Sequence, residues 1–124
     1  MTISEAISMA DELKPNMMSD IAKIRFLNEV EGKIFHEILM KHEHPDDMEC
    51  PEYDETTDTS TELLVEPPYD MLYVYWIISQ IDHMNMEMDK YNNDRTLFAD
   101  AWGNFADYWN REHMPLSART HFRI

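Results

Sequence analysis

Between Pro67 and Pro115 the apolar and aromatic side chains recur at helical spacing, and this stretch constrains the fold of the chain more than any other. Its first part, residues 71–78, is apolar nearly all round, which is typical of a helix buried on every side. Its last part presents one apolar face over several turns, formed by Phe98, Ala101, Trp102, Phe105, Ala106 and Trp109. The pattern predicts two long helices, a central one from near Asp70 to about Tyr91 and another from about Arg95 to His113.

The residues between these two helices predict how they are connected. Asn92-Asn93-Asp94 has the short polar side chains that tolerate a left-handed backbone and cap the next helix. We therefore expect a tight antiparallel helical hairpin that turns at Asn92–Asp94 and ends before Pro115.

Two further helices are predicted in the first third of the chain. Thr2-Ile3-Ser4-Glu5 is a capping box that opens a helix from Ile3 to about Leu13, which Pro15 ends. Ser19 and Asp20 then cap a second helix that runs to about Lys41. Charged side chains occupy the polar face of that second helix: Lys23, Glu29, Glu31, Lys33 and Glu37. Gly32 inside it costs about 1 kcal/mol relative to Ala, which a closely crossing helix would explain.

The net charge of −15 is concentrated in one part of the chain. Residues 42–70 hold eleven acidic side chains and no Lys or Arg. Residues 42–66 lack periodicity and are rich in Asp, Glu, Thr and Pro, so they predict a long exposed acidic loop whose end, 61–65, has the composition of a short extended segment. Loops of this length are often functional, although a tolerated insertion is the alternative. The negative electrostatic field of these acidic residues disfavours binding to a phosphate backbone.

Length and composition set the remaining bounds. A chain of 124 residues is expected to form one domain, and the single cysteine, Cys50, excludes an intrachain disulfide. The N-terminus lacks a signal-peptide pattern, and no apolar run is long enough to span a bilayer. We predict an all-α fold of about four helices: a helical domain over residues 1–115 with a central antiparallel hairpin and the acidic loop 42–66, followed by a short basic tail, 116–124.

Metal sites are poorly supported by the spacing of possible ligands. Residues 42–50 contain His, Asp, Glu and Cys but lack the two spaced ligand pairs of structural zinc. Asp54, Asp58 and Glu62 lack the glycine and the ligand alternation of an EF-hand. A di-iron bundle needs Glu-x-x-His on paired helices, and no such pair occurs. We therefore predict no metal site.

Catalytic motifs are equally absent from the sequence. Cys50 lies among acidic residues, which raise the pKa of a thiol and make it less reactive. The only glycines, Gly32 and Gly103, lie inside predicted helices, so no phosphate cradle can form. The aromatic residues follow helical spacing, which favours core packing over a ligand pocket, and any left uncovered would form an interface. We predict no catalytic residue, no cofactor and no enzymatic activity.

Several short blocks of residues stand out by their order along the chain. The N-terminal blocks are Leu13-Lys14-Pro15-Asn16 and Arg25-Phe26-Leu27-Asn28-Glu29-Val30-Glu31-Gly32. The central blocks are Leu63-Leu64-Val65-x-x-Pro68-Tyr69-Asp70-x-x-Tyr73 and Ile81-Asp82-x-x-Asn85-x-Glu87. The last comprise Tyr91-Asn92-Asn93, Phe98, Phe105, Tyr108, Arg111, His113 and Pro115. In this order the blocks resemble the small head-to-tail connector proteins of tailed bacteriophages and prophages.

The resemblance implies a structural head-completion protein, or adaptor, located in the virion at the head–tail interface and in the host cytoplasm during assembly. Such proteins form a ring, dodecameric by resemblance, beneath the portal protein, extend the DNA channel and dock tail-side connector or terminator proteins. DNA is then only passing cargo, and no membrane is involved. The family's C-terminal segment commonly contacts the portal, which here implies docking residues Leu116, Arg119, Phe122, Arg123 and Ile124.

The acidity also suits a different class of protein. An inhibitor that mimics DNA uses carboxylates in place of phosphates to occupy the basic groove of a nucleic-acid-binding enzyme. Such a mimic needs its acids arrayed on a rigid surface, whereas here eleven of twenty-five lie in residues 42–70, most of which are predicted to form a loop. The connector remains the leading hypothesis and the DNA mimic the alternative.

Overall fold

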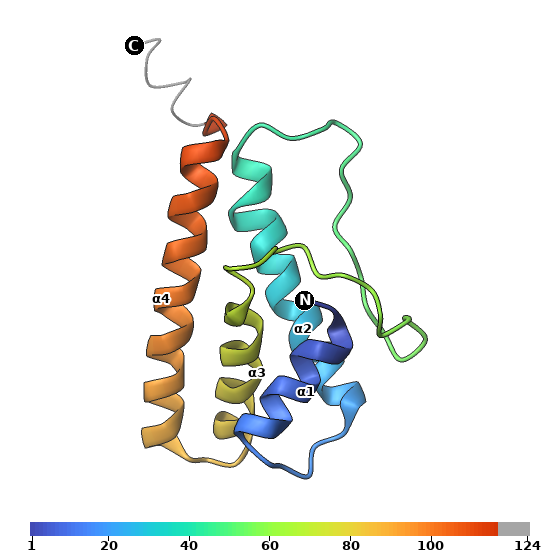
Figure 1. The fold of residues 1–124 in the computed structure, drawn as a ribbon, viewed down its shortest axis with the longest axis vertical. Helices are drawn as coiled ribbons and strands as arrows, with labels where there is room; N and C mark the ends of the chain where they lie inside the picture. Colours follow the sequence, from blue (N-terminus) through green and yellow to red (C-terminus); the bar gives the residue numbers. More distant parts are fainter. Residues whose placement is uncertain (117–124) are drawn as a thin grey trace.

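The computed structural model describes residues 1–116, which form four α-helices (Figure 1). These are α1 (Ile3–Leu13), α2 (Asp20–Glu37), α3 (Met71–Met84) and α4 (Met88–Glu112), with a single 3-10 turn, η1 (Leu39–Lys41), after α2. Among the described residues there is no strand, only two isolated bridges, Thr2 with Glu62 and His42 with Pro115. The predicted all-α fold of about four helices is confirmed.

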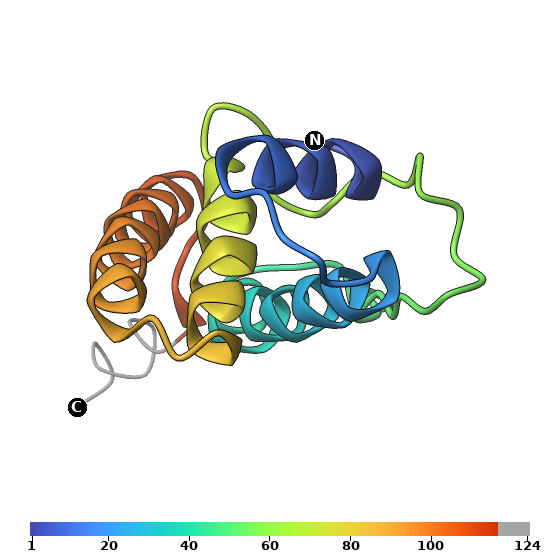
Figure 2. The ribbon, with the colours of Figure 1, turned by 90° about the horizontal axis from the view of Figure 1, so that it is seen from below.

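Helix α3 lies at the centre of the molecule. Seen end-on, it separates α4 from α1 and α2 (Figure 2), and it packs against all three. Its apolar side chains are buried on every side, as the apolar run at its start predicts: Leu72, Tyr73, Val74, Trp76, Ile77, Ile78 and Ile81. The central antiparallel hairpin is α3 with α4.

Helix α1 begins and ends where the sequence predicts. The Thr2 hydroxyl accepts a hydrogen bond from the Glu5 N–H at 3.1 Å, and the Glu5 carboxylate accepts one from the Thr2 N–H at 3.4 Å. This is the predicted capping box. Ile3, Ala6, Ile7 and Ala10 form the buried stripe that holds the helix on the body.

The predicted position of the hairpin turn is wrong. Helix α3 ends at Met84, α4 begins at Met88, and Asn92-Asn93-Asp94 lies inside α4. Chain reversal occurs instead at Asn85-Met86-Glu87, where Met86 has a left-handed backbone (φ 59°). The Glu87 N–H donates to the Asp82 carbonyl at 2.9 Å, which closes the turn.

The physical reason is an ion-pair cluster beside this turn. Asp82 is buried and paired with the Lys14 amine, and the Glu87 carboxylate lies 3.3 Å from the same amine. Placing Glu87 there requires the chain to reverse directly after Asn85. The two asparagines then cost only a few tenths of a kcal/mol each as exposed helical residues.

The acidic loop is less exposed than predicted. Tyr53, Leu63 and Val65 are buried in the core, although most of its acidic side chains are exposed. The Leu63 N–H donates to the Met1 carbonyl at 3.0 Å, and the Ile3 N–H donates to Thr61 at 3.1 Å. The end of the loop is therefore extended and attached to the start of α1.

The explanation offered for Gly32 is also wrong. A Cβ atom added at this residue would meet nothing within 4 Å, so no helix crosses closely there.

Candidate assembly surfaces

The predicted docking tail lies almost wholly outside the described residues. Arg119, Phe122, Arg123 and Ile124 belong to residues 117–124, whereas Leu116 is described and is 38% exposed. The surfaces that can be built from contacts are therefore on the helical body and the acidic loop.

A buried carboxylate fastens the acidic loop to the body. Glu31 on α2 is fully buried and accepts hydrogen bonds from the Tyr53 hydroxyl at 2.7 Å, the Tyr73 hydroxyl at 2.5 Å and the Leu64 N–H at 3.0 Å. The Tyr73 oxygen in turn accepts a hydrogen bond from the Val65 N–H at 2.9 Å. Two of the four groups belong to the returning end of the loop and one to its middle. This network holds the loop in place at two points.

Burial sets the acid–base properties of this network. It raises the pKa of Glu31, although the hydrogen bonds from Tyr73, Leu64 and Tyr53 oppose the rise. Burial and the adjacent Glu31 carboxylate likewise raise the pKa values of Tyr53 and Tyr73, so both remain hydroxyl donors. The sequence offered a signal for Glu31 that its assignment to the polar face missed: it stands four residues after Leu27 and four before Phe35, on the core face.

The loop displays a group of acids on either side of Tyr53. Asp46, Asp47, Glu49, Glu52 and Glu55 are exposed, and none forms an ion pair with another described residue. We call residues 46–55 the acidic segment. Asp54, within this segment, accepts hydrogen bonds from Thr56, and Asp58, just after it, accepts them from Ser60. These bonds lower the pKa of each carboxyl and organise the turns.

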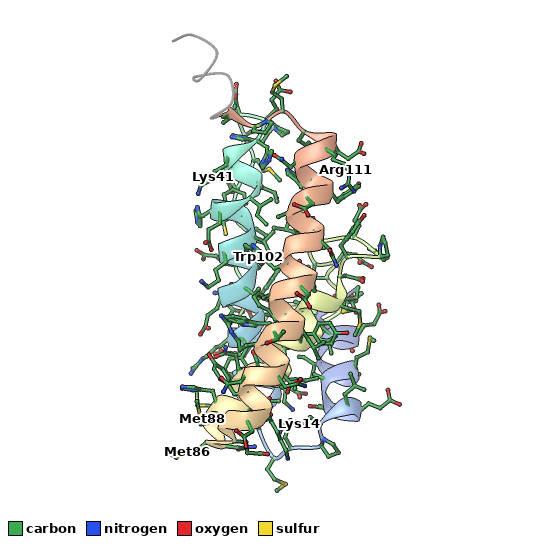
Figure 3. All side chains as sticks on the ribbon, turned by 90° about the vertical axis from the view of Figure 1, so that its left-hand side faces the viewer. Lys14, Lys41, Met86, Met88, Trp102 and Arg111 are labelled. Carbon is green, nitrogen blue, oxygen red and sulfur yellow. The ribbon has the colours of Figure 1, made fainter. Side chains whose placement is uncertain are left out.

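A groove runs between α2 and α4, which both pack against α3. It consists of two adjoining hollows of about 200 and 330 Å³. They share Glu37 and Trp102 and are otherwise lined by Lys33, Ile38, Lys41, His42, Trp76, Arg95, Phe98, Ala99, Ala106, Asp107 and Asn110. Figure 3 shows Lys41 at the end of α2 and Trp102 beside α4 on this side. We call this feature the α2–α4 groove.

Aromatic side chains and one arginine shape the lower part of the groove. The Arg95 guanidinium lies 5.2 Å from the centre of the Trp76 ring and 5.3 Å from that of Phe98, within cation–π range. The Trp76 indole N–H donates to the Phe26 carbonyl at 2.8 Å, which fixes this ring as the floor. Trp102 is half-buried and packs on Phe98. Most aromatic side chains of the described residues are buried in the core or pack against it, as their spacing predicts; Trp102 is half-buried in the groove, and Tyr75, Tyr108 and Trp109 are half-buried elsewhere.

The upper end of the groove is closed by contacts between the start of the acidic loop and the end of α4. His42 places Nδ1 2.6 Å from the Ile38 carbonyl and Nε2 3.1 Å from the Asn110 side-chain oxygen. The Glu43 N–H donates to the Met114 carbonyl at 3.0 Å. His42, a possible metal ligand by residue type, therefore has a packing role.

A second polar cluster lies at the other end of the molecule, where α1, α3 and α4 meet. Asp82 pairs with Lys14, and Glu87 contacts both Lys14 and the Lys90 amine, the latter at 2.6 Å. Burial, a hydrogen bond with Asp82 and the charge of Asp82 raise the pKa of Asp94 to about 6. Burial opposes the charge on Lys14, but Asp82 and Glu87 outweigh it and raise the pKa of this amine.

An open cavity of about 620 Å³ adjoins this cluster. Its lining is mainly apolar, with Leu13, Met71, Tyr75, Ile78 and Leu97 beside Lys14, Lys90 and Asp94. The charged members satisfy one another, so the cluster joins three helices rather than presenting free groups to a substrate.

Exposed apolar side chains collect at the same end of the molecule. Met86, Met88 and Lys14 all lie at this end in Figure 3, and Leu13, Met17 and Met84 are exposed at or next to the connections that follow α1 and α3. Methionine side chains adapt to irregular partners. This methionine-rich end is a second possible contact surface.

Among residues 1–116 no group of three or more His, Cys, Asp or Glu side chains could hold a metal ion. None of the described helices is both long and apolar enough to cross a bilayer. Cys50 is half-buried, and burial together with Glu31 and Glu52 raises the pKa of its thiol.

Comparison of the chain with protein families, curated proteins and solved structures gives no match. The class that the structure defines is an all-α protein whose four helices carry a firmly attached acidic loop.

Proposed function

We propose that this chain is a structural, non-catalytic head-to-tail connector of a tailed bacteriophage or prophage. In this role many copies form a ring beneath the portal protein, extend the DNA channel and offer a docking surface to tail-side proteins. The protein acts without metal or cofactor, and DNA passes through the ring without being bound. It resides at the head–tail interface of the virion after assembly in the host cytoplasm.

One observation carries the proposal: the sequence blocks that resemble connector proteins contact one another in the fold. Lys14 from the first block pairs with Asp82 and Glu87 from a central block. Glu31 from the second block accepts hydrogen bonds from Leu64 and Tyr73 of another central block. Each of these contacts joins two blocks that are far apart in the sequence. Such contacts are expected if the blocks belong to one shared connector fold.

The arrangement also suits a structural role. Four polar side chains of these blocks, Lys14, Glu31, Tyr73 and Asp82, join helices or attach the loop. The charged and apolar surfaces that remain, the acidic segment, the α2–α4 groove and the methionine-rich end, are broad and suit contacts with other proteins.

A DNA mimic is the second candidate, and one observation favours it. The acidic segment is held by the Glu31 network on one side and by the His42 contacts on the other, so its carboxylates have defined positions. A mimic acts on its target enzyme and forms no complex with a portal. The experiment below therefore separates the two candidates.

The test is to mix the purified protein with the portal protein encoded beside it and to examine the mixture by electron microscopy. The connector predicts a discrete ring stacked coaxially on the portal. A chain truncated after Pro115 should lose this complex, because it lacks the predicted docking residues. Absence of association at every ionic strength contradicts the proposal.

A further inference from the structure

The α2–α4 groove carries positive charge that the molecule itself does not neutralise. Lys41 and Arg95 form no ion pair with another described residue. Lys33 pairs only with Glu37, at 3.9 Å and with both side chains exposed, and such a pair contributes little. Against these three cations the lining holds two acids, Glu37 and Asp107. The groove is therefore weakly basic on a chain whose net charge is −15.

The groove also offers apolar contact area. Trp102 is half-buried at its centre, and Phe98 and Trp76 lie beneath Arg95. A ligand that fits both features combines carboxylates with small apolar side chains along an extended backbone. The half-buried Trp102 would supply contact area, and the cations of the groove would set the orientation of the ligand.

The acidic segment has this composition. Its exposed acids alternate with half-buried Met48, Cys50 and Pro51. It runs without regular secondary structure beyond the end of α2 (Figure 1), and Tyr53 within it is buried and bonded to Glu31 of α2, which fixes its position. Apart from Asp54, which accepts hydrogen bonds from Thr56, its carboxylates form no ion pair or hydrogen bond with another described residue, and Lys41 and Arg95 of the groove form no ion pair there.

The two surfaces lie on opposite sides of one copy. In Figures 1 and 2 the acidic loop projects on the side away from α4, whereas α4 forms one wall of the groove. The segment therefore cannot reach the groove of its own chain. A contact between them must join two copies head to tail, and repeated contacts of this kind close into a ring or extend as a filament.

We propose that the acidic segment of one copy docks in the α2–α4 groove of the next copy. This inference rests on the proposed connector function, because it supplies the contact between neighbours in the ring. The occupant of the groove is thus residues 46–55 of a second copy. Because the contact is between charged and partly exposed groups, it weakens as salt is added.

Charge reversal tests the contact with folded, full-length protein. The groove variant carries Lys33→Glu and Lys41→Glu, the segment variant carries Asp46→Lys and Asp47→Lys, and all four side chains are exposed. Arg25→Glu with Arg111→Glu is the matched control, because both residues are exposed and neither lines the groove. Sedimentation velocity at rising protein concentration and low salt measures self-association.

The proposal predicts that the wild-type protein self-associates and that each reversed variant does so with a dissociation constant raised by about tenfold or more. The control retains the wild-type constant. A chain with both reversals recovers association, because the signs are complementary again. A monomeric wild type, or reversed variants that associate like the wild type, overturns the proposal.

Portal mixing with the same variants separates this contact from the function. If the groove variant forms the wild-type ring on the portal, the docking contact is refuted and the connector function stands. If the wild type self-associates through the groove yet ignores the portal, the contact stands and the connector function fails.

Discussion

At the scale of single residues, Asp94 gives the fold a pH dependence whose sign can be worked out. The pKa of its carboxyl is about 6 in the folded protein against an ordinary 3.8, because burial and Asp82 favour the protonated form. The folded state therefore binds this proton more tightly than the unfolded chain. Its contribution to stability is complete below pH 3.8 and is lost as the pH rises through about 6.

Asp94→Asn removes this titration while keeping a donor beside Asp82. We expect the free energy of unfolding of the variant, relative to the wild type, to rise by about 1–2 kcal/mol between pH 4 and pH 7, a value reduced for partial exposure. Urea unfolding at several pH values measures it. Asp100→Asn, at an exposed position of the same helix, is the control. Parallel pH profiles for wild type and Asp94→Asn would contradict this account.

The Tyr53 hydroxyl tests whether the Glu31 network holds the loop. Tyr53→Phe keeps the buried ring and removes one of the three donors to Glu31, so the free energy of unfolding should fall by about 1–2 kcal/mol. Amide hydrogen exchange in residues 46–55 should become faster. The control is Tyr91→Phe, since the Tyr91 hydroxyl has no hydrogen bond to another described residue. Unchanged exchange in the loop would show that other contacts position it.

At the scale of elements, the turn between α3 and α4 stores backbone strain. Met86 has φ 59° and its side chain is 83% exposed, so it adopts a left-handed conformation with little packing in return. Met86→Gly should raise the free energy of unfolding by about 0.5–1 kcal/mol, because glycine adopts this conformation without a Cβ clash. Thermal unfolding measures the change.

The control for that turn is Met88→Gly. Met88 begins α4 and is also exposed, at 50%, but its backbone is helical, so glycine should lower stability there. If Met86→Gly also destabilised the protein, the turn would not lie at Asn85-Met86-Glu87.

The elements differ in how well local sequence predicts them. Local sequence predicts both ends of helix α1, because Thr2, Glu5 and Pro15 lie in the element or directly beside it. It does not predict the α3–α4 turn, since the position of that turn depends on Lys14, nearly seventy residues away in sequence, pairing with Asp82. That tertiary contact outweighs the local turn propensity of Asn92 and Asn93.

Dependence on contacts between distant residues also explains why the sequence predicts the candidate surfaces only in part. The acidity of residues 46–55 is visible in the sequence, but their attachment depends on Glu31, a charged residue at a core position. The groove unites Lys33 and Lys41 with Arg95, which come together only because α2 and α4 share α3 as a base. Contacts between distant elements were thus the missing information.

At the scale of the whole molecule, two opposite faces carry complementary surfaces. The acidic segment lies on one and the weakly basic, aromatic α2–α4 groove on the other, while the methionine-rich end lies at the bottom of Figure 1. Side-by-side copies would thus leave the ends of each copy free. In the proposed connector ring, such an arrangement would leave two open surfaces, one for the head and one for the tail.

The most direct test of the proposed connector function deletes this chain from the phage or prophage that the proposal expects to encode it. Electron microscopy of particles from cells carrying the deleted gene should show heads that lack tails, with no ring beneath the portal. Supplying the purified protein to these heads and to free tails should restore joined, infective particles. Tailed, infective particles formed without this chain would contradict the account.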